Sequence, residues 1–403
     1  MGAKLLLSTF VLVFISTEDF GVYVMIAKTL TIAIVVLGFD FYTYSQREIL
    51  QGEQTNQGQK IRDQFIFYFI NYLFILPLMF LVFYFDRISM EYIFWFYALL
   101  VLDHISQELY RILLVFKKSV IASALFFIKV GVWIFPLFAL WMFGFENLKN
   151  IKTILFFWTT FELLAIIFGL FFIKSLPFTI DFSTTINWDW IKKGLVICLP
   201  FFIGTIASNV IEFADIYMIK EYFGEDGDTQ IGIYGFFVNM GNIVQMFVQS
   251  AILIVFAPKL IESFSQDKTK YKSLHGQMSK QNILASVLFA ILVFVLLLPL
   301  VKFLGKTEIE QHYNLIYILV GAKVLFNFSM IYHYHLYVRH KDRLIVLTMI
   351  ISAIVNLCLN YVLIPLYGIY GAAFATLASF ILIFILKMVF AKNVLKKEKL
   401  KIV

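Results

Sequence analysis

Two acidic side chains lie three residues apart in an apolar stretch of the chain, SNVIEFADIYMIK (residues 208–220). Residues with this spacing share one face of a helix, so Glu212 and Asp215 would form a polar stripe with Asn209. A carboxylate near the middle of a bilayer costs about 2.5–3.5 kcal/mol, so such groups normally face a protein interior or a water-filled cavity. The stripe is therefore a candidate for binding a coupling proton or sodium ion, or for pairing with a lysine. A purely structural ion pair, or an acid near the membrane surface, is the alternative.

Basic side chains also lie within or at the ends of apolar stretches. Such groups can contact a phosphate or a carboxylate of a substrate, or pair structurally within the protein. Arg111 follows Glu108 by three residues, so these two could simply pair with each other. Further ionisable residues inside apolar stretches are Asp103, His104 and Glu162. We take as candidates for substrate binding Lys28, Arg47, Arg111, Lys129, Lys323 and Arg339, and as candidates for ion coupling Asp40, Glu212 and Asp215.

The composition places these residues in a membrane protein. Of the 403 residues 61% are hydrophobic and 15% are charged, and the mean hydropathy is +0.86. A membrane-spanning helix needs about 20 apolar residues, which predicts spans at about 3–15, 22–46, 64–85, 92–115, 119–143, 151–173, 194–219, 230–256, 281–303, 313–338, 343–364 and 368–390. The first is too short to cross and lacks a signal-peptide cleavage site, so either the true start lies upstream or this helix is abbreviated.

Lysine and arginine are distributed unevenly among the connections between these spans. If STEDF (residues 16–20) faces outward, 24 of the 33 basic residues fall on the inner side, including the C-terminal lysines from Lys387 onward. The positive-inside rule then predicts that both termini are cytoplasmic. The same bias accounts for the net charge of +7. No nucleic-acid partner is needed to explain it, and the lysine-rich tail is expected to lie against anionic membrane lipids.

An internal repeat organises the twelve spans. DFGVY (19–23) near the start of the second span is matched by QIGIY (230–234) near the start of the eighth. QELYRILLVFKK (107–118) and HLYVRHKDR (335–343) close the fourth and tenth spans at a similar offset. Because six is even, two such copies have the same orientation, and substrates of such proteins bind between the copies. We therefore predict an all-α polytopic membrane protein of about 12 transmembrane helices in two six-helix pseudo-symmetric lobes around a central cavity, with the lobes at 1–180 and 181–403.

Other chemistry is not indicated. No Walker A motif or nucleophile elbow is present, and the outer connections are too short to host a polymerase or glycosyltransferase site. Cys198 and Cys358 lie in different spans, and His333 and His335 point to different helix faces, so no metal site is expected. The sequence predicts a transporter with no cofactor and no metal rather than an enzyme.

Three stretches resemble one family. STEDFGVYVMIAKTLTIAIVVLGFDFYTYSQREI (16–49) is similar to the first loop and second helix of Wzx-type polysaccharide flippases. DIYMIKEYFGEDGDTQIGIY (215–234) is similar to their seventh-to-eighth junction, and NLCLNYVLIPLYGIYGAAFATLASF (356–380) to their eleventh and twelfth helices. Arg47 stands where such proteins carry a basic residue. Asp215 matches their acid in the seventh helix, although Ile216 replaces the arginine that often follows.

The resemblance implies a MATE-like V of two lobes in the multidrug/oligosaccharidyl-lipid/polysaccharide exporter superfamily. It implies a flippase that moves oligosaccharide repeat units linked to undecaprenyl pyrophosphate across the bacterial inner membrane, by alternating access coupled to a cation gradient, for O-antigen, capsule or exopolysaccharide. Its expected partners are the lipid-linked glycan, membrane lipids, a coupling proton or sodium ion, and polymerase or chain-length proteins. The alternative is a cation-coupled exporter of small molecules or drugs from the same superfamily.

Overall fold

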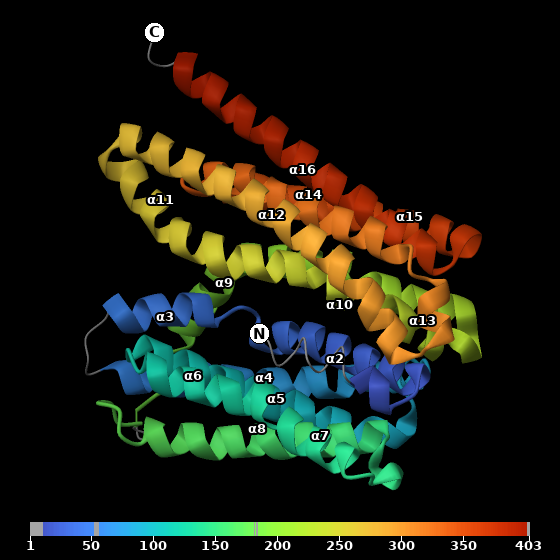
Figure 1. Cartoon of the computed structure of the whole chain (residues 1–403). Helices are drawn as coiled ribbons and strands as arrows, with labels where there is room; N and C mark the ends of the chain where they lie inside the picture. Colours follow the sequence, from blue (N-terminus) through green and yellow to red (C-terminus); the bar gives the residue numbers. More distant parts are fainter. Residues whose placement is uncertain (1–10, 52–55, 181, 183, 401–403) are drawn as a thin grey trace. The chain divides into compact units, whose positions relative to one another are not determined.

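The computed structural model of the chain describes residues 11–51, 56–180, 182 and 184–400, and every regular element among them is a helix (Figure 1). By packing, these residues divide into an N-terminal unit, residues 14–206, and a C-terminal unit, residues 207–400 with 11–13. The division falls inside helix α9 (Trp188–Phe223). The lobe boundary expected at 180 lies before that helix. Most of the short span expected at 3–15 lies outside the described residues.

The predicted membrane spans correspond closely to these helices. Nine helical stretches among the described residues are long and apolar enough to cross a membrane. The chain is a multi-pass membrane protein. Helix α5 (Ile93–Val115) has a similar length but is not one of the nine, because polar side chains occupy much of its surface.

The N-terminal unit is a bundle in which α5 packs against α2, α6 and α8. Two of its helices begin with side-chain caps: the Ser16 side chain accepts a hydrogen bond from the Asp19 amide at the start of α2, and Asn150 caps α8 in the same way. The elements of this unit are α2 (Thr17–Gly38), α3 (Tyr42–Gln51), α4 (Gln57–Tyr84), η2 (Met90–Tyr92), α5, α6 (Ser119–Phe127), η3 (Ile128–Val132), α7 (Ile134–Met142), η4 (Glu146–Leu148), α8 (Ile151–Ile173) and the first part of α9.

One predicted span is interrupted. The stretch expected as a single helix over 22–46 ends at Gly38 and resumes at Tyr42 as α3. Phe39 and Asp40 adopt left-handed backbone conformations with φ of 51° and 50°, which a helix cannot contain. Hydropathy gives no sign of this break, because it measures composition and not backbone conformation. The usual sequence signal is also absent, since the helix ends on an aromatic residue where glycine is common.

The C-terminal unit is built around α14, which packs against α10, α12, α15 and α16. Its helices start earlier or end later than the apolar runs predicted, because polar turns extend them: α12 begins at Lys268, where the Asp267 side chain accepts hydrogen bonds from two backbone amides. Its elements are the rest of α9, η5 (Gly224–Asp226), α10 (Gly227–Val248), η6 (Gln249–Leu253), α11 (Ile254–Gln266), α12 (Lys268–Leu304), α13 (Thr307–Gln311), α14 (Leu315–Tyr337), α15 (Asp342–Tyr367) and α16 (Ile369–Leu400).

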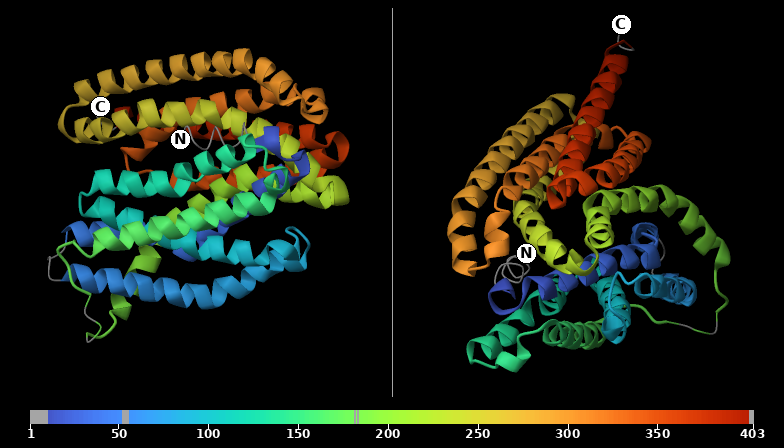
Figure 2. Two further views of the ribbon diagram at one scale, coloured as in Figure 1. Left: turned by 60° about the horizontal axis from the view of Figure 1, so that its bottom comes forward. Right: turned by 90° about the vertical axis from the view of Figure 1, so that its right-hand side faces the viewer.

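Two of the long helices are bowed. Figure 2 shows the curvature of α4, in blue, and of α12, in yellow and orange. Each contains a proline, Pro77 in α4 and Pro299 in α12, which removes one backbone hydrogen bond and lets the helix bend.

The first turns of α4 hold the segment that leads into α9. Arg62 donates to the Thr184 carbonyl (2.8 Å) and hydroxyl (2.7 Å) and to the Thr185 carbonyl (3.1 Å). Asp63 pairs with Arg62 (2.7 Å) and accepts from the Asn187 amide (3.0 Å). Both charged side chains are buried. Residues 184–187 are thus fastened to the N-terminal unit; we call this contact the α4 strap.

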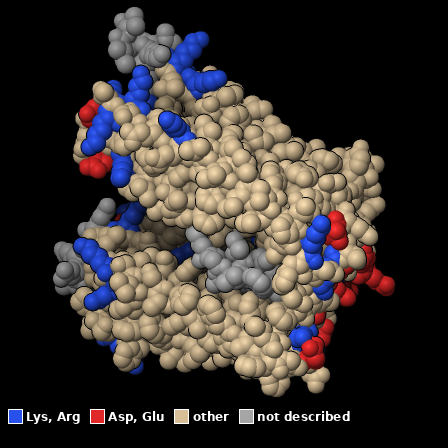
Figure 3. Space-filling model, viewed as in Figure 1, with Lys and Arg blue, Asp and Glu red and all other residues tan. Residues whose placement is uncertain are grey.

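On the outer surface of the C-terminal unit, charge lies mainly at the helix ends. On the face of the C-terminal unit seen in Figure 3, lysine and arginine gather where α11 meets α12 and along the end of α16, and the middle of the helices is free of charge. Acidic residues of η5 and α13 lie at the other helix ends. An apolar belt between polar ends is the pattern of a protein surrounded by lipid.

Candidate functional site

Helix α5 carries polar side chains on three sides. Asp103, Gln107 and Arg111, spaced four residues apart, line a cavity within the N-terminal unit. His104 and Glu108, also four apart, face α4. A helix with polar groups on so many sides cannot turn any of them toward lipid without a large free-energy cost, so the neighbouring helices must supply partners.

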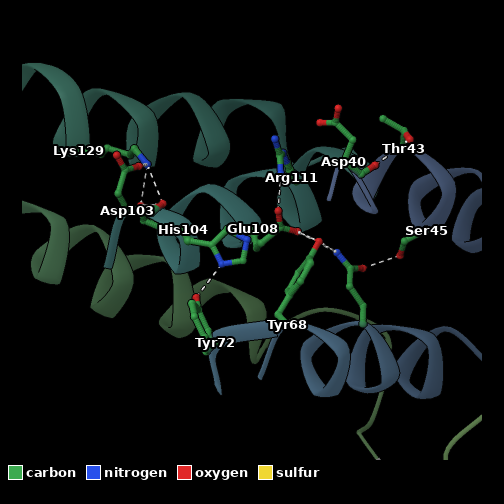
Figure 4. A network of polar contacts seen from close by, with 12 residues as sticks. Asp40, Thr43, Ser45, Tyr68, Tyr72, Asp103, His104, Glu108, Arg111 and Lys129 are labelled. Carbon is green, nitrogen blue, oxygen red and sulfur yellow. Dashed lines mark hydrogen bonds and ion pairs between the residues drawn. The ribbon is translucent and has the colours of Figure 1, made fainter. Parts of the chain in front are cut away.

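Lys129 joins two acids from different helices. It lies in the π-helical turn η3, and its ammonium donates to the Asp103 carboxylate and to Ser106 Oγ (2.8 Å). The Glu162 carboxylate of α8 lies 3.9 Å from the same nitrogen and accepts from Ser106 Oγ (2.7 Å). One ammonium therefore serves two carboxylates (Figure 4 shows Lys129 with Asp103). We call Asp103, Ser106, Lys129 and Glu162 the Lys129 cluster.

A second network centres on Glu108, which is buried. Its carboxylate accepts from Gln64 Nε2 (2.8 Å), from the Tyr68 hydroxyl (3.1 Å) and from Arg111. The Arg111 guanidinium also lies over the Tyr42 ring, 3.5 Å from its centre. Figure 4 shows the contacts that run from Arg111 through Glu108 to side chains of α4. The pairing of Arg111 with Glu108 that the sequence suggested is present.

Between these groups lies a cavity of about 230 Å³. Its wall includes three of the predicted candidates, Asp40, Arg111 and Lys129, which come from the α2–α3 break, α5 and η3. Lys129 and Arg111 each have a carboxylate partner, so the wall carries acids and bases in balance rather than an excess of cations. The full lining is Thr31, Ile34, Val35, Gly38, Asp40, Tyr42, Asp103, Gln107, Arg111, Phe126, Lys129 and Val130.

In the C-terminal unit Glu212 and Lys323 meet. Lys323 Nζ lies 3.4 Å from Glu212 Oε1, and also 5.1 Å from the centre of the Phe380 ring. Lys323 is buried, whereas the Glu212 side chain is partly exposed. This pair from α9 and α14 corresponds to one of the two interpretations that the sequence left open, pairing of the acid with a lysine.

Asp215 has different partners from Glu212, although the two are one turn apart. It is buried and accepts a short hydrogen bond from the Tyr234 hydroxyl of α10, with Thr376 Oγ1 of α16 at 3.5 Å. Glu212 and Asp215, which the sequence places on one polar stripe, therefore contact different partners. Tyr234 and Thr376 both contact Asp215 through their hydroxyl groups.

The remaining predicted residues are Lys28, Arg47 and Arg339. Lys28 is partly buried in α2, and Arg47 is exposed in α3. Arg339 follows α14, where it donates to the Tyr271 hydroxyl (3.3 Å) and to the His335 carbonyl (3.0 Å) and lies over the Phe264 ring.

Several residues of these networks were not singled out from the sequence. Ser106, Gln64, Tyr68, Tyr234 and Thr376 are neutral, and a neutral polar residue in an apolar helix gives little signal by itself. The four-residue spacing of Asp103, Gln107 and Arg111 was visible in the sequence and could have identified the cavity-lining side of α5. No group of three or more metal-ligating side chains occurs among the described residues.

Comparison with protein-family models and with curated proteins finds no match. Solved structures do match. A structure described as the inward-facing conformation of a multidrug resistance MATE family transporter of the MOP superfamily has a TM-score of 0.78 at 12% identity, covering 98% of this chain and 94% of that one. An outward-facing structure of the same description has a TM-score of 0.61 at 13% identity, covering 94% and 87%. A Vibrio cholerae MATE transporter variant has a TM-score of 0.59 at 13% identity, covering 98% and 99%.

These likenesses extend over nearly the whole length of each protein. The chain has the fold of MATE transporters, and the all-α polytopic fold class that the sequence predicted is confirmed. At this level of identity the likeness concerns the fold, and the activity must be argued from the side chains.

Proposed function

We propose that the chain is a secondary transporter that works by alternating access and exports a small organic solute at the expense of a cation gradient. The fold likeness to proteins described as multidrug resistance transporters supports this proposal over the lipid-linked glycan flippase that the sequence resemblance implies. A transporter, not an enzyme, is also what a chain with its polar groups inside membrane helices suggests.

The observation that carries the proposal is the Lys129 cluster. Two carboxylates, Asp103 and Glu162, share one ammonium, so the cluster has one negative charge more than its lysine can neutralise. Glu162 is fully buried, where an uncompensated charge is costly. A proton or a sodium ion binding between the two acids would relieve that excess. Because Lys129 and Asp103 also line the cavity, the cation and a solute would influence each other there.

The coupling then follows because the bound cation and Lys129 compete for the same two carboxylates. With the cation bound, Lys129 is released from part of its pairing and the wall of the cavity becomes more positive. When the cation leaves, Lys129 is drawn back to the two acids and the wall loses this added positive charge. The candidates Asp40 and Asp215 add acids in the N-terminal and C-terminal units, of which Asp40 lines the same cavity.

The test is Glu162→Gln in proteoliposomes that hold the full chain, with efflux of a panel of amphipathic fluorescent solutes measured under imposed proton or sodium gradients. The substitution removes the second acid and retains the shape. We expect uphill transport to fall by about tenfold or more and its dependence on the gradient to disappear, since the excess charge that binds the cation is gone.

Glu146→Gln is the matched control. Glu146 pairs with Lys149 in η4 and its side chain is 74% exposed, so this variant should transport like the parent chain. Equal dependence on the gradient in Glu162→Gln and the parent would sink the assignment of the cluster.

The lipid-linked glycan flippase is the second candidate. The stretch 356–380, which carries the most specific resemblance, forms the adjoining parts of α15 and α16. Arg111 and Lys129 in a cavity wall could receive a phosphate if their carboxylates released them. In that case the substrate would be an oligosaccharide on undecaprenyl pyrophosphate, the site of action the bacterial inner membrane, and both termini cytoplasmic.

Deletion followed by leaflet analysis separates the two candidates. A flippase predicts that lipid-linked glycan accumulates on the cytoplasmic side and that Lys129→Met or Lys323→Met lowers surface polysaccharide at unchanged membrane abundance. An exporter predicts normal surface polysaccharide and increased sensitivity to toxic solutes. Lys392→Met, at an exposed position of α16, is the control for abundance.

A further inference from the structure

One buried lysine lies outside the two units' polar networks. Lys387 of α16 is 2% exposed, although the sequence places it among the basic residues of the inner surface. It continues the buried side of α16 that includes Phe380, Ile383 and Ala391. Its ammonium nitrogen lies 5.6 Å from the centre of the Phe326 ring of α14.

Lys387 differs from the other two buried lysines in its surroundings. Lys129 and Lys323 each lie within ion-pair distance of a carboxylate, and Lys387 has no such partner among the described residues. A cation–π contact with a phenylalanine is a weak substitute for an ion pair. A permanent charge in these surroundings would strongly destabilise the packed state.

The other titratable groups near Lys387 do not compensate its charge. On α14 the charge neighbour is His333, a second base, whose Nδ1 is buried and makes no hydrogen bond within the described chain. Helix α15 carries charged side chains only in its first turn, Asp342 and Arg343. The acids of α9 that face this unit's interior are engaged elsewhere, Glu212 with Lys323 and Asp215 with Tyr234.

We propose that Lys387 is a proton-binding site of the C-terminal unit: the amine is uncharged while α14 and α16 are packed around it, and it takes up a proton when water reaches it. The ligand is a proton, and the group that binds it is the ε-amine, whose lone pair accepts it without any other bond change. As a coupling site this rests on the proposed function, since alternating access is what would carry these helices between packed and hydrated states. The protonation chemistry itself does not depend on what is transported.

The experiment measures the apparent Tm of the full chain in one detergent from about pH 9 to about pH 6. An amine that is uncharged in the folded state and protonated in the unfolded state makes the protein less stable as the pH falls, because the unfolded state binds more protons. Lys387→Met removes this effect. We expect the Tm of Lys387→Met to exceed that of the parent by an amount that grows as the pH is lowered.

Lys392→Met, on an exposed position of the same helix, should give a profile parallel to that of the parent. A difference between Lys387→Met and the parent that is the same at every pH overturns the proposal. So does a difference that disappears when chloride is replaced by gluconate, because Lys387 would then be a charged group that holds an anion.

Lys387→Arg covers the case in which the methionine variant does not fold. Arginine stays charged at all of these pH values, so this variant should have a lower Tm than the parent throughout. An arginine variant as stable as the parent would contradict an uncharged amine. If the parent chain transports no solute, the proposed function fails while the Tm profiles still decide the protonation of Lys387.

Discussion

At the scale of single residues, the buried charges of this chain are arranged in groups rather than in isolated pairs. Glu108 takes hydrogen bonds from a guanidinium, an amide and a phenol, and Asp103 and Glu162 share Lys129 with a serine between them. Such groups satisfy the lone pairs that a single ion pair would leave bare. Their members come from helices that are far apart in the sequence, so each group also specifies which helices pack together.

Removing the Glu108 charge tests this arrangement. In Glu108→Gln the Arg111 guanidinium loses its carboxylate while its surroundings stay the same, so we expect the protein to lose up to about 3 kcal/mol of stability. The apparent Tm in detergent is the measurement. Because Arg111→Gln in the same chain removes the orphaned charge, the double variant should recover part of the loss, and a double variant that is worse than either single one would contradict the pairing.

At the scale of helices, the two glycines of YGIYGAAFAT are required for two different structural reasons. Gly368 ends α15 with φ of 59°, a conformation that favours glycine. Gly371 lies where a side chain could not fit, since a Cβ there would be 2.0 Å from the Leu363 carbonyl oxygen. The most specific motif of the sequence thus records how closely α15 and α16 approach each other as they turn.

Gly371→Ala should therefore destabilise the hairpin of α15 and α16 strongly, because backbone would have to move to admit one methyl group. Gly276→Ala in α12 meets no atom within 4 Å. In that open position alanine should raise stability by about 0.5–1 kcal/mol, since glycine weakens helix interiors. The comparison is made by apparent Tm and by yield of folded protein. Equal effects of the two substitutions would show that the close approach is absent.

The sequence predicts helices well and predicts their interruptions less well. Apolar runs of about 20 residues located most spans, because the bilayer sets their length. The break at Phe39 and Asp40 is missed because phenylalanine gives no sign of a left-handed turn and a single aspartate gives only a weak one. Lys387 was counted with the surface because hydropathy cannot tell a lysine at a helix end from one turned inward. The separate partners of Glu212 and Asp215 depend on α10, α14 and α16, which one helix's spacing cannot reveal.

At the scale of the whole molecule, the first part of α9 belongs by packing to the N-terminal unit. Trp190, Ile191 and Cys198 lie in one core cluster with Phe41 and Tyr44. The α4 strap adds hydrogen bonds just before that helix. The beginning of α9 is therefore part of the core of the N-terminal unit.

A chain divided into two co-expressed fragments, 1–182 and 183–403, should consequently copurify when only the first carries an affinity tag. Gly194→Phe in the second fragment is the matched variant: a Cβ at Gly194 would already lie 2.5 Å from the Phe41 ring, so a larger side chain should reduce the recovered partner several-fold. Fragments that separate on the column without any substitution would contradict the assignment of early α9 to this unit.

The α4 strap has a consequence for how this connection can change in evolution or by engineering. Residues 184–187 meet Arg62 and Asp63 through specific carbonyls and amides, so their alignment is set as it would be in a paired strand. Adding or deleting one residue between Thr184 and Asn187 would shift these atoms relative to one another and leave a buried side chain of α4 facing the wrong group. The last residues of a stretch that reads as a spacer are, in this molecule, of fixed length.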